Sequence, residues 1–332
     1  MIRTALLSRW HVHADEYAEA AMKSHLIAVE KVWDENPERG REWADSLGVT
    51  YEENLEKVLA DPEIDAVIVA SPTNMHTRIM LAAASHKKHI FTEKVLALSA
   101  RDAQEVLQSM EEHDVRLVIS LPRLVEGYYL YAQKALDDGL LGKLTAIRCR
   151  MAHNGAVSEG DGGGWLPAHF FDREECGGGA FIDLGAHPIY LANRICGPLS
   201  AVTAVFQEHG HGVDVNSAAI VEYESGVLAI LETGFVSYGS PFQLELYGTE
   251  GTIMIEDKAV KIKSKMLGED WLTPEDIPSS LEMPIDQWAA SIAEGKEPSI
   301  TGEDAYRLSL LNELASISAR EGRRVTAQEL PE

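Results

Sequence analysis

The chain reads Ala-Val-Ile-Val-Ala-Ser-Pro-Thr-Asn-Met-His from residue 66 to residue 76, and this stretch shows the pattern that decides the fold. Five consecutive apolar residues predict a strand that is buried on both faces. A polar turn follows at residues 71–74, and a helix then runs to about Ser85. A buried strand followed by a turn and a helix is the repeating unit of a covered parallel sheet.

The same unit recurs on both sides of this stretch. Asn36 and Pro37 mark one helix start, as an N-cap and a first-turn proline, and Gly48 marks its end. Right-handed crossovers arrange such units into a doubly wound, Rossmann-like α/β domain, which we expect over residues 1–121. The further predicted strands are 2–7, 26–33, 89–92 and 117–120, and the further helices are 14–23 and 99–113.

Polar residues follow these strands, where a doubly wound sheet binds its ligand. Asp34 ends the second strand, where a carboxylate accepts the two ribose hydroxyls of an adenosine and repels a 2′-phosphate. This favours NAD over NADP, although the same acid can simply complement the dipole of the next helix. The other candidate cofactor contacts are Ser8, Trp10, His11, Val12, His13, Arg39, Ser71, Pro72, Thr73, Asn74, His76, Glu93 and Lys94.

The first turn departs from the usual dinucleotide pattern. Residues 8–13 read Ser-Arg-Trp-His-Val-His where Gly-x-Gly-x-x-Gly is expected. The Trp10 side chain must point away from any phosphate, while the amides of residues 11–13 can still present a helix N-terminus to an anion. His11 and His13 also suggest a metal pair, but no cysteine or carboxylate stands at ligand spacing beside them, so we expect no metal.

The sequence pattern changes beyond residue 121. A helix is predicted at 126–138, ended by Gly139, and a strand at 144–151. Alternating apolar and polar residues then predict strands with one polar face at 201–207, 217–223, 227–233, 242–247 and 251–255. We therefore expect a second domain, of the α+β type, over residues 122–332.

Residues 177–187 read Gly-Gly-Gly-Ala-Phe-Ile-Asp-Leu-Gly-Ala-His and place Asp183 four residues before His187. If a helix begins here, both side chains share one face. A carboxylate beside an imidazole orients the ring and raises its proton affinity, as acid–base chemistry near neutral pH requires. The alternative is a helix cap and a surface pair.

Composition excludes several function classes. The formal charge of −24 argues against nucleic acids and anionic membranes, which select basic surfaces. Three widely spaced cysteines, Cys149, Cys176 and Cys196, fit a reducing compartment. The apolar stretch after Met1 is too short for a signal peptide or a spanning helix, so we expect a cytoplasmic protein.

These motifs, in their order and spacing, resemble the Gfo/Idh/MocA family of oxidoreductases over residues 2–325. Glu93-Lys94 and Asp183-x-Gly-x-His187 carry the likeness, together with residues 32–39, 71–76, 89–94, 284–288 and 301–305. The resemblance implies a C-terminal domain built on a large open, mostly antiparallel sheet that forms a homodimer or homotetramer. It also implies hydride transfer between NAD and a carbinol carbon of a sugar, inositol or related polyol.

In such enzymes the residues that match Lys94, Asp183 and His187 surround the reacting carbon. His187 oriented by Asp183 can take the hydroxyl proton and Lys94 can stabilise the alkoxide, but which of Lys94 and His187 is the base stays open. This chain has Val95 in place of the proline of Glu-Lys-Pro, and Tyr190 where an acid often follows the histidine. The candidate substrate contacts are Arg123, His153, Asn154, Trp165 and Tyr190.

Purely structural roles remain open for two of these residues, since Trp165 can fill the core and Arg123 can pair with a surface acid. Two other functions also remain open. One is an enzyme that retains its NAD and epimerises a sugar or cleaves a glycoside. The other is a cofactor-free sugar-binding regulatory protein, which Ser8, Trp10 and His13 in place of glycines would suit.

Overall fold

The computed structural model describes residues 1–157 and 164–330, and the chain divides into two compact units. The first comprises Met1–Leu121 with Glu282–Tyr306, and the second comprises Pro122–Leu281 with Arg307–Glu332. This division differs from the predicted one, 1–121 and 122–332, because the chain returns to the first unit near its C-terminal end. There α9 (Pro284–Ala293) packs on the first sheet, with the fully buried Trp288 ring 5.9 Å from Phe91.

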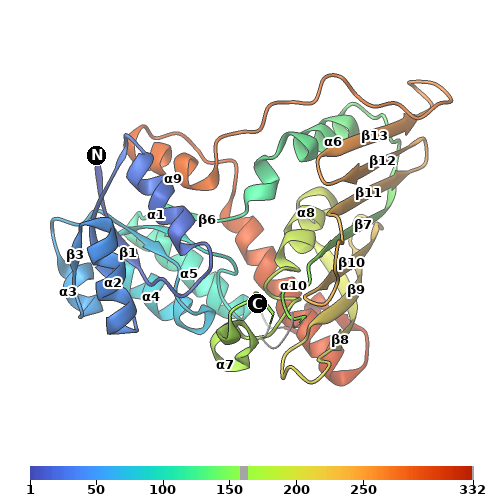
Figure 1. The fold of residues 1–332 in the computed structure, drawn as a ribbon. Helices are drawn as coiled ribbons and strands as arrows, with labels where there is room; N and C mark the ends of the chain where they lie inside the picture. Colours follow the sequence, from blue (N-terminus) through green and yellow to red (C-terminus); the bar gives the residue numbers. More distant parts are fainter. Residues whose placement is uncertain (158–163, 331–332) are drawn as a thin grey trace. The chain divides into compact units, whose positions relative to one another are not determined.

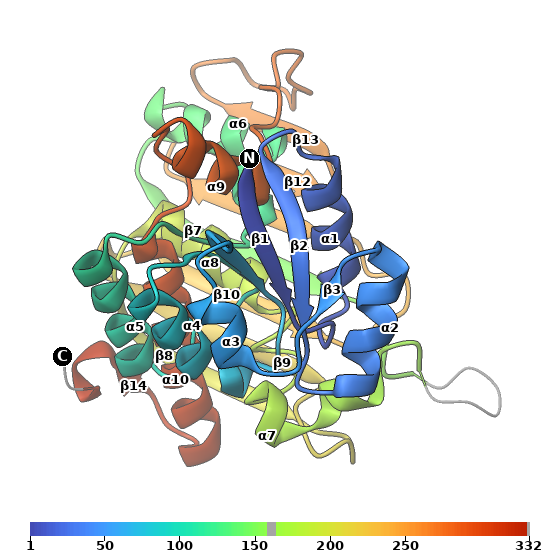
Figure 2. The same ribbon diagram turned by 90° about the vertical axis from the view of Figure 1, so that its left-hand side faces the viewer.

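The first unit is built on a six-stranded sheet in the order β3-β2-β1-β4-β5-β6, in which every pair is parallel. Figure 2 shows β1 and β2 side by side. The strand order reverses between β1 and β4, which is the switch point of a doubly wound fold and confirms the predicted fold class. The strands are β1 (Ile2–Leu7), β2 (Ile27–Trp33), β3 (Thr50–Tyr51), β4 (Ala66–Val69), β5 (His89–Thr92) and β6 (Leu117–Ile119).

The helices of this unit begin and end where local signals place them. The Asn36 side chain caps α2 by accepting from the amides of Glu38 and Arg39, and Gly48 ends it at φ +70°. The short elements β3 and α3 were not predicted, because two and six residues show no clear period. Its helices are α1 (Ala14–Lys23), α2 (Pro37–Leu47), α3 (Leu55–Ala60), η1 (Thr73–Met75), α4 (His76–Ser85), α5 (Ala100–His113) and α9.

The second unit is built on an eight-stranded sheet in the order β13-β12-β11-β7-β10-β9-β8-β14 (Figure 1). Only the β7–β10 pair among these is parallel, so the sheet is mostly antiparallel, as the resemblance implied. The strands are β7 (Leu144–Ala152), β8 (Leu199–Gln207), β9 (Asn216–Tyr223), β10 (Leu228–Gly234), β11 (Gln243–Gly248), β12 (Gly251–Glu256), β13 (Ala259–Ser264) and β14 (Val325–Thr326).

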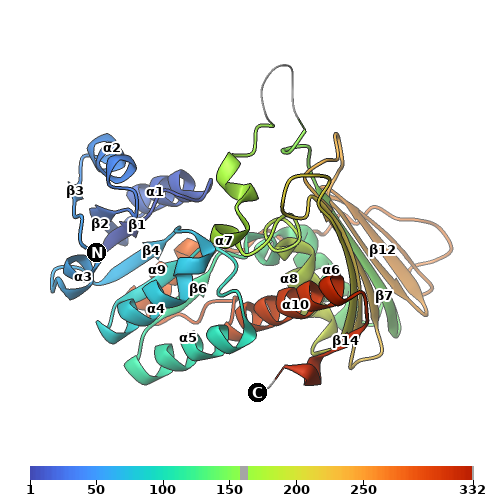
Figure 3. The ribbon, with the colours of Figure 1, turned by 90° about the horizontal axis from the view of Figure 1, so that it is seen from below.

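Helices cover one face of this sheet. In Figure 3, α6, α8 and α10 lie on one side of its strands, over a core row that includes the fully buried Cys149, Leu231 and Leu244. The helical elements of this part of the chain are η2 (Pro122–Val125), α6 (Gly127–Asp137), η3 (Ala168–Phe171), α7 (Arg173–Cys176), α8 (Ala186–Cys196), α10 (Gly302–Glu321), which begins within the first unit, and η4 (Ala327–Glu329). Among the described residues, none of these helices or those of the first unit combines the length and apolarity that crossing a membrane requires.

Candidate functional site

The turn after β1 keeps a glycine-like conformation without a glycine. Ser8 is fully buried and has a φ of +76°, in the left-handed region that glycine adopts without cost. Its Oγ accepts a hydrogen bond from the Trp10 amide at 3.1 Å, and its own amide donates to Trp33 O at 2.7 Å. These bonds hold a tight turn between β1 and α1, as a dinucleotide fold requires.

The amides expected to face an anion are partly engaged within the chain. The His11 amide donates to Ala70 O at 3.1 Å, and the His13 amide donates to His11 Nδ1 at 3.2 Å. Two of the three amides therefore already have an acceptor. The Trp10 side chain is buried, and Val12 is exposed.

Asp34 lies at the end of β2, as predicted, but its carboxylate has several donors. The amides of Arg9 and Asn36 each donate to it at 2.8 Å. The Arg39 guanidinium donates to both of its oxygens, at 2.9 and 2.7 Å, and the Asp34 side chain is fully buried beneath it. Burial opposes the charge on Arg39, but Asp34 outweighs this effect and raises the Arg39 pKa above its ordinary value. Arg39 therefore neutralises the acid expected to contact a ribose.

The loop after β4 is tied to the loop after β5 by a histidine. Ser71 and His76 are buried, and Pro72, Thr73 and Asn74 connect them through η1. The His76 ring places Nδ1 2.8 Å from Val95 O and Nε2 3.1 Å from Ser71 O. Burial lowers the His76 pKa from its ordinary value, and the two carbonyl oxygens only partly offset this effect.

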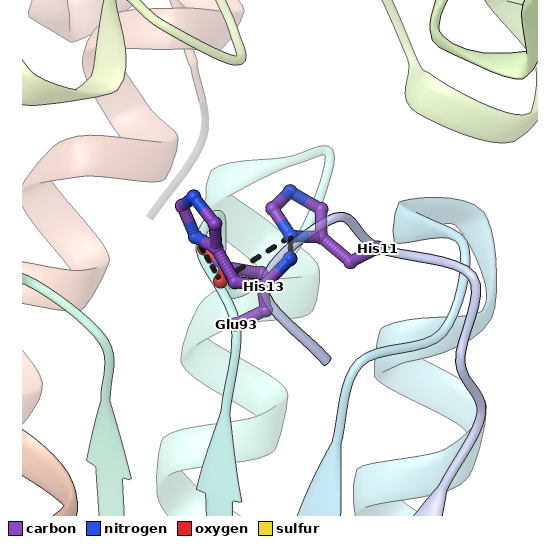
Figure 4. A group of neighbouring side chains, drawn as sticks. All are labelled: His11, His13 and Glu93. Atoms are coloured by element: carbon purple, nitrogen blue, oxygen red, sulfur yellow. Dashed lines mark hydrogen bonds and ion pairs between the residues drawn. The ribbon is translucent and has the colours of Figure 1, made fainter. Parts of the chain in front are cut away.

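Glu93 and Lys94 follow β5 and are both buried. Glu93 Oε1 accepts from the Lys94 amide at 2.8 Å, and the Tyr17 hydroxyl donates to Oε2. His13 Nδ1 lies 3.3 Å from Oε2 and His11 Nδ1 lies 3.5 Å from it (Figure 4).

The charges around Glu93 determine the direction in which its pKa is shifted. Burial disfavours the Glu93 carboxylate, but the facing histidines outweigh this effect and hold the Glu93 pKa well below its ordinary value.

The peptide bond between Lys94 and Val95, where the family has a proline, is cis.

In the second unit, His187 lies on α8 and is 7% exposed. Its Nδ1 lies 2.7 Å from the Tyr190 hydroxyl, which also accepts from the Arg123 amide at 3.2 Å. Burial raises the Tyr190 pKa well above its ordinary value, so the hydroxyl stays protonated. Tyr190 thus orients the His187 ring at Nδ1.

The condition under which Asp183 and His187 would share one helical face, a helix that begins at Asp183, is not met. The helix begins only at Ala186, and Asp183 lies in the preceding turn, where its amide donates to Gly179 O at 3.1 Å. The glycines before it close the loop on Asp214, since a Cβ at Gly179 would lie 2.0 Å from Asp214 O. A side chain at position 179 would therefore prevent this close approach of the two backbone segments.

The remaining substrate candidates form two groups. Arg123 donates to the Tyr128 hydroxyl at 3.0 Å and lies 4.5 Å from the centre of the Phe242 ring, in an aromatic setting rather than in the surface ion pair considered above. Its backbone joins it to Tyr190 and His187.

The second group contains His153, Asn154 and Trp165. Trp165 Nε1 donates to Asn154 Oδ1 at 3.3 Å, and the Trp165 and His153 rings lie 4.6 Å apart. Trp165 is 59% exposed, so it does not fill the core. Residues 158–163, in whose loop the sequence placed Trp165, lie outside the described residues.

Three residues beside these groups were missed. Tyr17 stands four residues after His13, a helical spacing that the sequence does display. Asp214 and Tyr128 reach their partners only through tertiary contacts. The Asp214 carboxylate accepts from the amides of Gly179 at 2.9 Å and Phe181 at 2.8 Å, and from Ser217 Oγ at 2.7 Å.

A doubly wound parallel sheet with a tight turn after β1 and an acid ending β2 defines the class of dinucleotide-binding Rossmann proteins. The chain belongs to the Gfo/Idh/MocA oxidoreductase family, because the family's NAD-binding Rossmann fold matches residues 10–121 and its C-terminal domain matches residues 129–254. The resemblance drawn from the motifs is confirmed.

The relatives include polyol dehydrogenases. Myo-inositol 2-dehydrogenase of Thermotoga maritima is 26% identical over 319 residues, covering 90% of each chain. The scyllo-inositol 2-dehydrogenase (NAD(+)) of Bacillus subtilis is 27% identical over 317 residues, covering 89% of this chain and 86% of its own. A solved levoglucosan dehydrogenase, in complex with NADH and levoglucosan, shares the fold at a TM-score of 0.83 and 20% identity, covering 98% of this chain and 99% of its own.

Proposed function

We propose that the protein is an NAD-dependent dehydrogenase that transfers a hydride between NAD and a carbinol carbon of an inositol, a sugar or a related polyol. Relatives aligned over nearly the whole chain carry inositol dehydrogenase names. The observation that carries the proposal is the buried His187, whose ring is held at Nδ1 by Tyr190. Oxidation of an alcohol needs such an oriented base for the hydroxyl proton.

The first unit fits a dinucleotide. Ser8 supplies the left-handed conformation after β1, and α1 begins at Ala14, at the end of this turn. Asp34 stands where a ribose is read, and Arg39 is its partner. We propose that Asp34 gives preference for NAD over NADP, with Arg39 holding the carboxylate in place. The loops after β1, β4 and β5 would hold the rest of the cofactor.

Bound NAD would supply the hydride acceptor, and side chains of the protein would accept the proton of the substrate hydroxyl. When Nδ1 of His187 carries the ring hydrogen and donates to Tyr190 Oη, Nε2 presents the lone pair that accepts the hydroxyl proton. The Lys94 cation would stabilise the developing alkoxide, and Asp183 would raise the proton affinity of the site. In the alternative assignment, Lys94 takes the proton and His187 positions the hydroxyl.

Polar and aromatic side chains would select the substrate. Aromatic faces pack on the C–H faces of sugars, and short polar groups pair with hydroxyls. Trp165 and Asn154 form one such pair, and the Tyr190 hydroxyl lies beside Arg123, whose backbone amide donates to it. His153 stacks on Phe235 at 5.0 Å, which fixes its ring.

Turnover of a panel of inositols and sugars, followed by NADH formation, tests the function. His187→Asn should lower kcat by about 10²–10⁴-fold, because it removes the acid–base group. His209→Asn, at an exposed turn residue of the same unit, is the matched control. Equal turnover of all three proteins would remove His187 from the mechanism. Turnover without net NADH formation would point to a retained cofactor.

We also propose a homo-oligomer formed through the uncovered face of the second sheet. Ile220 and Ile230 are cross-strand neighbours on that face and are 51% and 45% exposed. Arg148 beside them pairs with Glu232 at 2.7 Å. An apolar patch with a charged rim is typical of a protein interface. In the described part of the chain, Cys149, Cys176 and Cys196 are buried and form no disulfide, which supports a reducing, cytoplasmic location.

A further inference from the structure

Three side chains of types that can bind metal ions lie close together in the first unit, near the ends of β1 and β5. His11, His13 and Glu93 each offer one ligand atom, and these atoms lie within 4.8 Å of one another (Figure 4). Glu93 stands 80 residues after His13, so the fold provides the carboxylate that ligand spacing along the sequence lacks. His11 and Glu93 are 6% and 1% exposed, unlike the surface acids that gather without a metal.

The spacing of these atoms suits a metal better than hydrogen bonds. A charged N–H···O bond between an imidazole and a carboxylate is about 2.7–2.9 Å long. Here His13 Nδ1 and His11 Nδ1 lie 3.3 and 3.5 Å from Glu93 Oε2. Two ligands of a tetrahedral ion bound at about 2.1 Å lie about 3.4 Å apart.

A hydrogen bond within the cluster orients one of the rings. The His13 amide donates to His11 Nδ1 at 3.2 Å, and the same nitrogen lies 3.5 Å from Glu93 Oε2. A metal bound at His11 Nδ1 would replace this amide hydrogen bond.

Neighbouring groups already hold the carboxylate in one orientation. The Tyr17 hydroxyl donates to Glu93 Oε2, and the Lys94 amide donates to Oε1 at 2.8 Å. Such outer hydrogen bonds orient the ligands of protein metal sites. The His13 side chain is 37% exposed, which gives an ion a path from solvent.

We propose that His11, His13 and Glu93 bind a divalent first-row transition metal ion of the zinc type. Two imidazole nitrogens and one carboxylate oxygen suit such ions, whereas Mg²⁺ and Ca²⁺ prefer oxygen ligands alone. Three protein ligands leave a fourth position for water or an anionic oxygen. The inference concerns metal binding only and does not depend on the proposed dehydrogenase activity.

The full-length protein without an affinity tag tests this after removal of metal with a chelator. Calorimetric titration with Zn²⁺ alone should show one site per chain, and Co²⁺ should give the visible absorption of a four- or five-coordinate ion. Glu93→Gln and His13→Asn should each weaken Zn²⁺ binding more than about tenfold, and Tyr17→Phe by about tenfold. His25→Asn, an exposed histidine of the same unit, should bind Zn²⁺ like the wild type.

Circular dichroism of each variant checks its fold, and Tyr17→Phe gives a reading if Glu93→Gln does not fold. Absence of Zn²⁺ binding by the wild type would overturn the proposal. Equal binding by all variants would do so as well, because the ion would then lie elsewhere. NADH titration of the metal-free protein distinguishes the metal site from the proposed dehydrogenase function. NADH binding without any Zn²⁺ binding would contradict the metal site alone.

Discussion

At the scale of single residues, the first turn shows how a dinucleotide fold keeps its geometry without glycine. Ser8 adopts the left-handed conformation at φ +76°, and its Oγ bond to the Trp10 amide helps to offset the cost. A left-handed conformation costs a residue with a Cβ about 1–2 kcal/mol. The hydroxyl therefore stabilises a turn that glycine would form without strain.

Substitution of Ser8 separates the cost of the left-handed conformation from the contribution of the Oγ hydrogen bond. Ser8→Ala loses the Oγ hydrogen bond and keeps the strained φ, whereas Ser8→Gly loses both. We expect Ser8→Gly to be more stable than Ser8→Ala by about 1 kcal/mol in urea unfolding. Equal stability of the two variants would show that the turn stores no such strain.

His89 gives the fold a dependence on pH. Its Nδ1 accepts from the Arg116 amide at 3.0 Å, which requires an unprotonated nitrogen. Burial, and then the Arg116 charge, lower the His89 pKa from its ordinary 6.5. The unfolded chain therefore binds the proton more tightly. The stability present above the unfolded pKa is lost as the pH falls below it and through the lower folded pKa.

His89→Asn keeps an acceptor for the Arg116 amide and removes the titration. The free energy of unfolding should fall less steeply for this variant than for the wild type between about pH 7 and pH 5. His76, whose pKa burial also lowers, accounts for a further part of the slope. Parallel stability profiles for the two proteins would contradict the role of His89.

At the scale of elements, local signals set the strands and helices of the first unit, while contacts distant in sequence set the site. The predicted strand 89–92 and helix 14–23 match β5 and α1 residue for residue, because the pattern of apolar residues is a local property. The segment before α8 contacts Asp214, which lies 35 residues beyond Gly179, so no local signal shows where this helix begins. Likewise, the approach of Glu93 to His11 depends on strand order, and no spacing in the sequence reveals it.

The Gly177–His187 loop depends on Asp214. This carboxylate is 5% exposed and accepts from two amides and one hydroxyl. Asp214→Asn would turn one acceptor oxygen into a donor that faces the Phe181 amide and Ser217 Oγ. We expect a loss of about 2–4 kcal/mol in the free energy of unfolding, measured by denaturant titration. A loss below about 0.5 kcal/mol, as at an ordinary surface site, would show that the loop does not need this anchor.

At the scale of the whole molecule, the chain joins a Rossmann unit to a sheet with one covered face. The uncovered face carries exposed apolar residues, including Ile220 and Ile230, beside the Arg148 ion pairs. Ile230→Lys would place an unpaired charge at the centre of this face. We expect it to convert the oligomer to monomers in analytical ultracentrifugation, while Met22→Lys, at an exposed position on α1, leaves the oligomer intact. A monomeric wild type, or an unaffected Ile230→Lys, would remove this interface.

We expect the glycine-free turn, with Asp34 held by Arg39, to bind NAD. Calorimetric titration of the purified protein with NADH and with NADPH measures this binding. We predict binding of NADH in the micromolar range and binding of NADPH that is at least about tenfold weaker, because a 2′-phosphate would meet the Asp34 carboxylate. Binding of neither nucleotide would contradict the account. Tighter binding of NADPH would show that Arg39, and not Asp34, reads the ribose.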